Sequence, residues 1–170
     1  MSTLFVNKLK AAVGSVINVP SGQVIKAEAE GSIVAPGQVI QVVQGSYSGH
    51  TNTASSSYVD TGIQATITPT SASSLIYVFL NFVGGNTSAS AENHLQILRG
   101  STSIRIMDRW GFNAGGHTNI HGATIVKDSP NTTSATTYKV QYRTQSGNFR
   151  INDFYNNANH STLTLMEVAQ

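Results

Sequence analysis

The chain has 170 residues, of which 39% are hydrophobic and 11% are charged, and its net charge is +2. Since a typical soluble domain carries about 25% charged residues, small neutral groups must supply the polar surface, and the few scattered basic residues exclude the charged footprint of a nucleic-acid-binding protein. The absence of cysteine excludes disulfides and thiolate metal sites.

The first residues of the chain predict an attachment segment. They lack the basic start and the long apolar run of a signal peptide. Leu4, Phe5 and Val6 form an isolated apolar triplet with nothing nearby to pack on, so we expect it either to anchor the chain on a neighbour or to be disordered. The longest apolar stretch, Leu75–Val83, is too short to span a bilayer, and no membrane insertion is expected.

A repeated phrase predicts where an N-terminal arm ends. Val19–Lys26 (VPSGQVIK) returns as Val34–Gln41 (VAPGQVIQ), and each copy is a Pro/Gly turn followed by a short β-prone run. Two copies are too few for a stacked repeat fold, which needs about three units to bury a core. We therefore expect an extended arm over residues 1–36 and a head domain over residues 37–170.

The head alternates short β-prone runs with turn residues, and no amphipathic helix of three turns is visible. Tyr138, Val140 and Tyr142 alternate with polar residues, which predicts the buried face of a strand. Leu75–Leu80 is apolar on both faces and predicts a central strand covered on both sides, followed by a turn at Gly84–Asn86. The expected strands cover residues 39–44, 63–68, 75–80, 95–99, 103–106, 120–126, 138–143, 149–154 and 163–168. This spacing predicts an all-β fold, an antiparallel β-sandwich of the jelly-roll type.

Two polar-aromatic loops are candidate receptor-binding or interface surfaces. The first holds Asp108, Arg109, Trp110 and Asn113, and the second holds Phe154, Tyr155, Asn156 and His160. Aromatic rings beside Asn, Asp and Arg suit sugar recognition, and binding residues gather on loops held by a rigid scaffold. However, a lone Trp is more often a core or interface residue, and Asn-rich loops usually form turns. Both interpretations stay open for both loops.

The sequence predicts no catalytic or metal site. His117 and His121 lie four residues apart, which on a strand is about 13 Å and too far for one ion, although each could form a ring of three on a threefold axis. The acids are isolated from one another along the sequence, and no Gly-x-Ser-x-Gly motif is present. We therefore expect a protein without enzymatic activity, metal or other cofactor.

Five phrases of this chain resemble those of a known family. They are Ser2–Lys8 (STLFVNK), Pro36–Val43 (PGQVIQVV), Leu95–Ile104 (LQILRGSTSI), Asp128–Gln141 (DSPNTTSATTYKVQ) and Ser161–Val168 (STLTLMEV). They resemble small virion structural and tail-fibre-like proteins of tailed bacteriophages, which are common in marine and cyanobacterial phages. The resemblance covers most of residues 36–170, and its motifs lie on strands and turns.

The resemblance implies a non-enzymatic virion structural protein with a β-sandwich head. The head is expected to form a homotrimer and to project from the surface of the phage particle, to which the N-terminal arm attaches it. The implied partners are copies of the chain itself and other virion proteins of the capsid or tail. Because almost no shaft is present, tail fibre, head fibre and capsid decoration all stay open. The alternative is a tail-fibre tip that binds a host cell-surface glycan.

Overall fold

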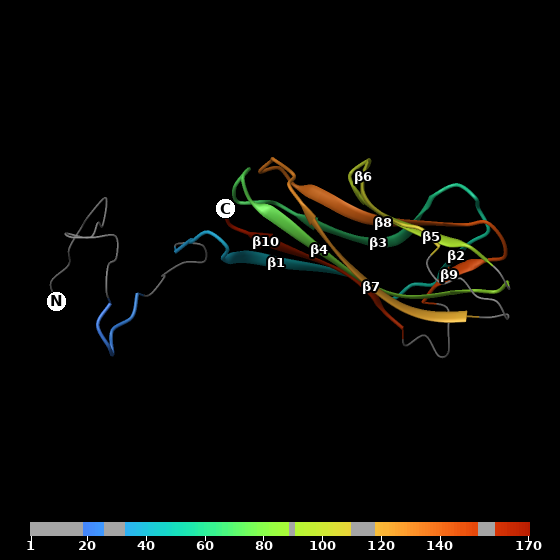
Figure 1. Cartoon of the computed structure of the whole chain (residues 1–170), viewed down its shortest axis with the longest axis horizontal. Coiled ribbons are helices and arrows are strands. Elements are labelled where there is room, and N and C mark those ends of the chain that lie inside the picture. The colour runs from blue at the N-terminus through green and yellow to red at the C-terminus, as the bar shows by residue number, and fades with distance from the viewer. Residues whose placement is uncertain (1–18, 26–32, 89–90, 110–117, 153–158) are drawn as a thin grey trace. The chain divides into compact units, whose positions relative to one another are not determined.

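A computed structural model describes residues 19–25, 33–88, 91–109, 118–152 and 159–170 of the chain. The chain divides into two parts, residues 1–33 and residues 34–170, and each is described by itself. The second part, called the head below, contains all of the described strands (Figure 1).

Ten strands make up the described part of the head, and no helix occurs in it. In chain order they are β1 (Val39–Tyr47), β2 (Thr51–Thr53), β3 (Val59–Ile67), β4 (Leu75–Asn86), β5 (Asn93–Arg99), β6 (Thr102–Met107), β7 (Thr118–Asp128), β8 (Thr136–Thr144), β9 (Phe149–Ile151) and β10 (Ser161–Val168). They form two antiparallel sheets. The six-stranded sheet runs β1-β10-β4-β9-β2 with β7 also paired to β4, and the four-stranded sheet runs β3-β8-β5-β6.

The strand pairing is nested. β1 pairs with β10, β2 with β9, β3 with β8, β4 with β7 and β5 with β6, all antiparallel. The chain is therefore one long hairpin that is rolled up, with the pairs β1–β10, β2–β9 and β4–β7 in the six-stranded sheet and the pairs β3–β8 and β5–β6 in the four-stranded sheet. This arrangement is a jelly roll, and it confirms the predicted antiparallel β-sandwich.

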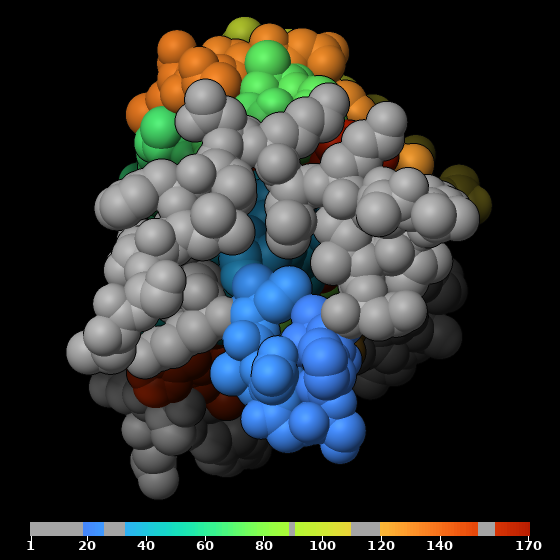
Figure 2. All heavy atoms as spheres, turned by 90° about the vertical axis from the view of Figure 1, so that its left-hand side faces the viewer, coloured from blue at the N-terminus to red at the C-terminus, as the bar shows by residue number. Residues whose placement is uncertain are grey.

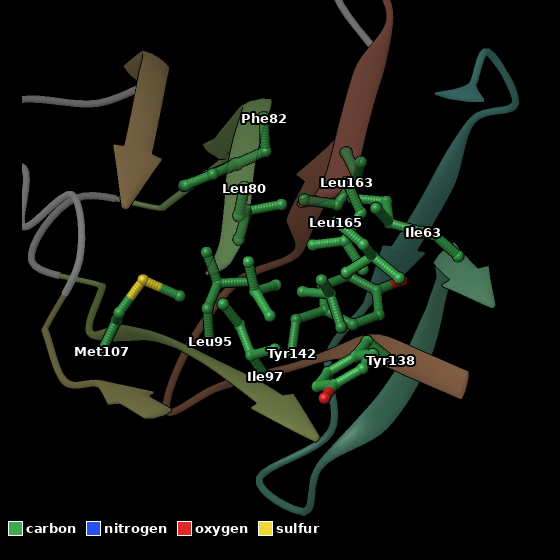
Figure 3. Packing of buried hydrophobic residues seen from close by; sticks show 14 of the residues in the cluster. Ile63, Leu80, Phe82, Leu95, Ile97, Met107, Tyr138, Tyr142, Leu163 and Leu165 are labelled. Atoms are coloured by element: carbon green, nitrogen blue, oxygen red, sulfur yellow. The ribbon is translucent and has the colours of Figure 1, made fainter. Parts of the chain in front are cut away.

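The core lies between the two sheets, where every second residue of each long strand points inward (Figure 3). Tyr138 and Tyr142 of β8 are buried to within 1% of their surface, as the alternation in the sequence predicts. The Tyr142 ring lies 5.5 Å from the Phe149 ring at a tilt of 59°, an aromatic arrangement that adds to the burial of apolar area. From the six-stranded sheet, Phe82 and Leu163 pack against the same cluster.

Two predictions about β4 are wrong. Gly84–Asn86 does not turn the chain but extends β4, pairing with β7 on one side and with β9 on the other. Glycine is required here because a Cβ on Gly84 would lie 2.9 Å from the carbonyl oxygen of Arg150. The amide of Asn86 is buried and donates to the Asn93 side chain at 2.7 Å, so a polar residue can end a buried strand.

The second wrong prediction concerns how β4 is covered. β4 is central in its sheet, and its inward residues Ile76, Val78 and Leu80 are buried. Its outward residues Tyr77 and Phe79 are only half-buried, because they point away from the core. The apolar residues on both faces of this run therefore reflect a core on one side and an open sheet face on the other.

The repeated phrase adopts the same turn twice. Gly22 has φ +82° and Gly37 has φ +83°, values that favour glycine in a type II turn. The backbone N–H of Gln23 donates to the carbonyl of Pro20 at 3.1 Å, and that of Gln38 donates to Ala35 at 3.0 Å. The second copy continues into β1, whereas the first is followed by Val24 and Ile25, which are exposed. The attachment role of the arm stays a prediction.

Candidate functional site

The outer face of the four-stranded sheet carries a row of charged and aromatic side chains. Tyr58 precedes β3, Arg143 lies on β8, His94 on β5 and Asp108 directly after β6. Strand register places His94 opposite Arg143, and Asp108 one residue beyond the pair Leu95–Met107. The Arg143 guanidinium lies 5.1 Å from the centre of the Tyr58 ring, a cation–π distance.

His94 is the buried centre of this row. Its Nδ1 atom lies 2.9 Å from the Asp108 carboxylate, and because a carboxylate only accepts, Nδ1 is the donor. Its Nε2 atom is buried and has no hydrogen-bond partner in the described part of the head, the Glu92 carboxylate being 4.0 Å away. Glu92 also pairs with Arg109 at 3.1 Å. The cluster of Glu92, His94, Asp108, Arg109 and Arg143 is called the His94 cluster below.

A second row continues this polar face. The Lys139 ammonium donates to Asp60 at 3.0 Å, the Gln141 amide donates to Asp60 at 2.7 Å, and the Gln96 amide donates to Gln141 at 2.7 Å. Burial on its own would raise the pKa of Asp60, but the hydrogen bonds from Gln141 and Lys139 outweigh it and hold the pKa below its ordinary value. The outer face of the four-stranded sheet is thus a hydrogen-bonded polar surface suited to water.

The outer face of the six-stranded sheet is different in kind. Register across β1, β10, β4 and β7 aligns three complete rows, Val42–Met166–Tyr77–Lys127, Gln44–Thr164–Phe79–Ile125 and Ser46–Thr162–Asn81–Ala123, and a shorter row, Val39–Val168–Leu75. The apolar members Val39, Val42, Leu75, Tyr77, Phe79, Ile125, Met166 and Val168 are called the apolar face below. Val42 and Ile125 are each 58% exposed, although both are large and hydrophobic.

Charge is almost absent from these rows. Lys127, on the edge strand β7, is the one Lys, Arg, Asp or Glu among them, and all of their residues lie in the described part of the chain. The remaining polar members are amides and hydroxyls, and the Gln44 amide already donates to the Thr164 hydroxyl at 2.8 Å. An uncharged apolar centre with neutral polar neighbours is the composition of a protein–protein interface core.

Two carboxylates, the buried Glu167 and the partly buried Asp128, stabilise the head rather than form a site. Glu167 accepts from the Gln41 amide at 2.6 Å and from the backbone N–H of Thr70 at 2.8 Å. Burial would raise the pKa of Glu167, but these and neighbouring hydrogen bonds outweigh it and lower the pKa. This cluster lies at the end of the head where the β3–β4 and β7–β8 loops are side by side (Figure 1; Figure 2, green and orange at the top).

The second carboxylate, Asp128, ends β7. Arg99 donates to both of its oxygens at 2.8 Å, and the Tyr138 hydroxyl donates at 2.7 Å. Burial first, and then the neighbouring Asp128 carboxylate, raises the pKa of Tyr138 well above its ordinary value, so the hydroxyl stays a donor. The three side chains connect the edge of one sheet to the centre of the other.

The structure brings together part of the predicted site. Asp108 and Arg109 both belong to the His94 cluster, with side chains 67% and 71% exposed. His160 is exposed just before β10, and His121 is exposed on β7. The other predicted residues lie outside the described residues: Leu4, Phe5, Val6, Trp110, Asn113, His117, Phe154, Tyr155 and Asn156.

Sequence reasoning missed the most distinctive features of both faces. Glu92 and His94 lie at the start of β5, whereas Arg143 lies on β8 and Asp108 follows β6, and only the register of β5 with β8 and β6 brings them together. The apolar face did leave a signal, the two-sided apolar run Leu75–Leu80, which was interpreted as burial on both sides. In the described part of the chain, no three His, Asp or Glu side chains gather closely enough to hold a metal ion. The described residues also contain no helix that could cross a membrane.

Comparisons with known proteins add distant likenesses. No protein-family model and no curated protein matches the sequence. Solved structures of infectious bursal disease virus are similar in fold. The Gt strain structure is 11% identical over 91% of this chain with a TM-score of 0.40, the Gx strain structure is 15% identical over 86% with 0.41, and the VP2 subviral particle is 11% identical over 91% with 0.42.

This chain spans 42% of the length of each of these three viral chains. At TM-scores below 0.5, the jelly-roll assignment rests on the nested strand order of the head and not on these likenesses.

Proposed function

We propose that this chain is a non-enzymatic structural protein of a tailed-phage particle, a short trimeric fibre or decoration protein. The observation that carries the proposal is the apolar face: eight hydrophobic side chains, seven of them at least partly exposed and Val168 buried, in rows that hold a single charge. Isolated exposed hydrophobic residues are ordinary, but a contiguous apolar patch indicates a surface that is covered in the working assembly. The sequence resemblance is the reason for proposing that the assembly is a phage particle.

The N-terminal arm has the attachment role in this proposal. Its exposed Val24 and Ile25 follow a fixed turn, and among the described residues they form no strand, unlike β1 after the second copy of the phrase. Leu4, Phe5 and Val6 are the proposed anchor residues on a capsid or tail protein. The head then projects from the particle surface, where several weak contacts act together.

The test is incorporation into particles of the parent phage. Removing residues 1–30 leaves the head and both of its sheets intact, so the truncated protein should fold, remain soluble and be missing from purified particles. Gold-labelled antibody against the head should decorate particles that carry the full chain. A truncated protein that still enters particles would place the anchor in the head, and an unlabelled full-length particle would contradict the virion role.

A second candidate function is recognition of a host cell-surface glycan by the His94 cluster. The observation that favours it is the exposed pair Asp108 and Arg109 beside a buried histidine, since charged hydrogen-bonding groups at a strand end suit hydroxyl-rich ligands. Arg109→Ala should then lower adsorption to host cells at least tenfold. Arg105→Ala, which removes an exposed arginine from the neighbouring strand β6, is the matched control and should leave adsorption unchanged.

A further inference from the structure

We infer that the partner that covers the apolar face is a second copy of the same chain. This inference rests on the proposed function and names the surface through which the head associates with itself. The face has an apolar centre at Met166, Tyr77 and Phe79, with Val42 and Ile125 exposed on either side of it. Aromatic residues and methionine are enriched at the centres of interfaces between proteins.

The charge pattern favours self-association over a different partner. A surface that recognises a charged partner carries the complementary charges, which fix the register and exclude wrong partners. The rows of the apolar face hold only Lys127, and it lies on the edge strand β7. Two copies of this face therefore meet without repulsion between like charges at its centre. By contrast, the outer face of the four-stranded sheet holds acids and bases that would have to give up their contact with water in a contact between subunits.

The polar members of the rows are complementary to themselves. Gln44 and Asn81 each carry a donor and an acceptor on one amide, and Ser46, Thr162 and Thr164 carry both on one hydroxyl. The same residue type on two copies can therefore satisfy itself, as the Gln44–Thr164 hydrogen bond of 2.8 Å illustrates within one copy. A carboxylate or an ammonium group cannot do this.

The size of the face also fits a subunit contact. Strands in a sheet lie about 4.8 Å apart and every second residue is about 6.8 Å further along, so four strands by four rows cover roughly 20 by 25 Å. A standard interface buries about 800 Å² on each partner, and about 500 Å² of side-chain-covered sheet supplies most of that area. Around a threefold axis, three such faces turned inward would each contact the same faces of the other two copies, so one surface can serve a trimer.

The experiment compares two double variants of the full-length chain. Val42→Asp with Ile125→Asp places two charges on the apolar face at positions 58% exposed, away from the core. Gln64→Asp with Ser103→Asp is the matched control, two charges at exposed strand positions on the outside of the four-stranded sheet. Sedimentation velocity at micromolar concentration gives the oligomeric state of both and of the unchanged chain, and circular dichroism checks that each is folded.

The expected result is a trimer for the unchanged chain and for the control, and a folded monomer for the apolar-face variant, with association weakened at least 100-fold. A trimeric apolar-face variant would overturn the inference while leaving self-association, and with it the proposed function, intact. An unchanged chain that is already monomeric would overturn both self-association and the inference, whereas its incorporation into particles would still be tested separately. If the unchanged chain is a monomer and the apolar-face variant also fails to enter particles, another virion protein covers the face.

A second measurement keeps the inference testable if the aspartate variant does not fold. The chain contains no cysteine, so Val42→Cys introduces a single thiol on the apolar face, and Ser103→Cys introduces one on the opposite side as control. A short thiol-specific crosslinker should join the Val42→Cys chains into covalent dimers and leave the Ser103→Cys chains uncrosslinked at the same concentration. Equal crosslinking of the two variants would contradict the proposed contact.

Discussion

The two outer faces of the head are built on the same fold but differ in chemistry. On the four-stranded sheet, Asp60 and Gln141 bond to their neighbours across the strands, and the exposed groups are satisfied. On the six-stranded sheet, Val42 and Ile125 expose hydrophobic surface with no bonding network to replace it. The inward residues form the core of the sandwich. The outward residues can therefore differ according to what each face contacts. The first face is suited to water, and the second to another protein surface.

The largest effect is expected at Gly45, where β1 of one sheet lies close to β3 of the other. Gly45 of β1 faces β3 so closely that a Cβ would overlap the carbonyl oxygen of Gln64. Gly45→Ala should therefore push the sheets apart and lower the free energy of unfolding by about 3 kcal/mol. Urea denaturation measures the loss. Ser46→Ala, an exposed neighbour on the same strand, is the control and should be nearly neutral; equal losses would show that the sheets are not in contact there.

A smaller loss is expected from the carboxylate that links the two sheets. Asp128→Asn keeps the shape but weakens the bonds to Arg99 and Tyr138, which donate to a charged group in the unchanged protein. The expected loss is about 2 kcal/mol in the free energy of unfolding. Lys127→Gln changes the charge of the adjacent exposed residue and should have little effect on stability. A neutral Asp128→Asn would mean that the network is not formed in solution.

The free energy of unfolding of the head is expected to depend on pH through Glu167. Because its folded-state pKa lies below the ordinary value, its ionised form stabilises the head fully above about pH 4.3, and that stabilisation is lost as the pH falls through the folded-state pKa. Glu167→Gln should therefore be about 1.5 kcal/mol less stable than the unchanged chain at pH 7. The difference should shrink at pH 3. Thermal melts at both values measure it, and a difference that grows on acidification would contradict the assignment.

The smallest effect is expected on the polar face. Lys139→Gln breaks the ion pair with Asp60, but both groups are in contact with water, with side chains 30% and 56% exposed. Such pairs contribute roughly 0.2–1 kcal/mol, so the melting temperature should fall by a degree or two at most. Oligomeric state should be unchanged. A dissociated Lys139→Gln variant would show that subunits meet through the four-stranded sheet instead.

Much of the fold could be predicted because apolar and polar residues alternate along its strands. In β8, inward Tyr138 and Tyr142 alternate with polar residues, and the sequence correctly predicts which residues of this strand face the core. Where alternation stops, prediction fails. Gly84–Asn86 has the composition of a turn, and only the neighbouring backbone of β9 makes glycine necessary inside a strand.

The candidate surfaces were harder to predict, because they depend on which strands are neighbours. Nothing in the sequence places Val42 beside Met166 or His94 beside Arg143, since those residues are far apart along the chain. The isolated acid Asp108 acquires a partner only when β6 returns along β5. For the same reason, an apolar residue on the open face of Leu75–Leu80 cannot be distinguished from one in the core by its sequence alone.

The nested pairing of strands has a consequence for how the head is made in the cell. β10 lies between β1 and β4, so the six-stranded sheet has no continuous backbone bonding until Ser161–Val168 is in place. The innermost hairpin, β5–β6, can pair as soon as both of its strands have been made, but β1 keeps an unpaired edge until β10 has been made. The apolar face therefore exists only after all four of its strands have been made, which delays association between nascent copies.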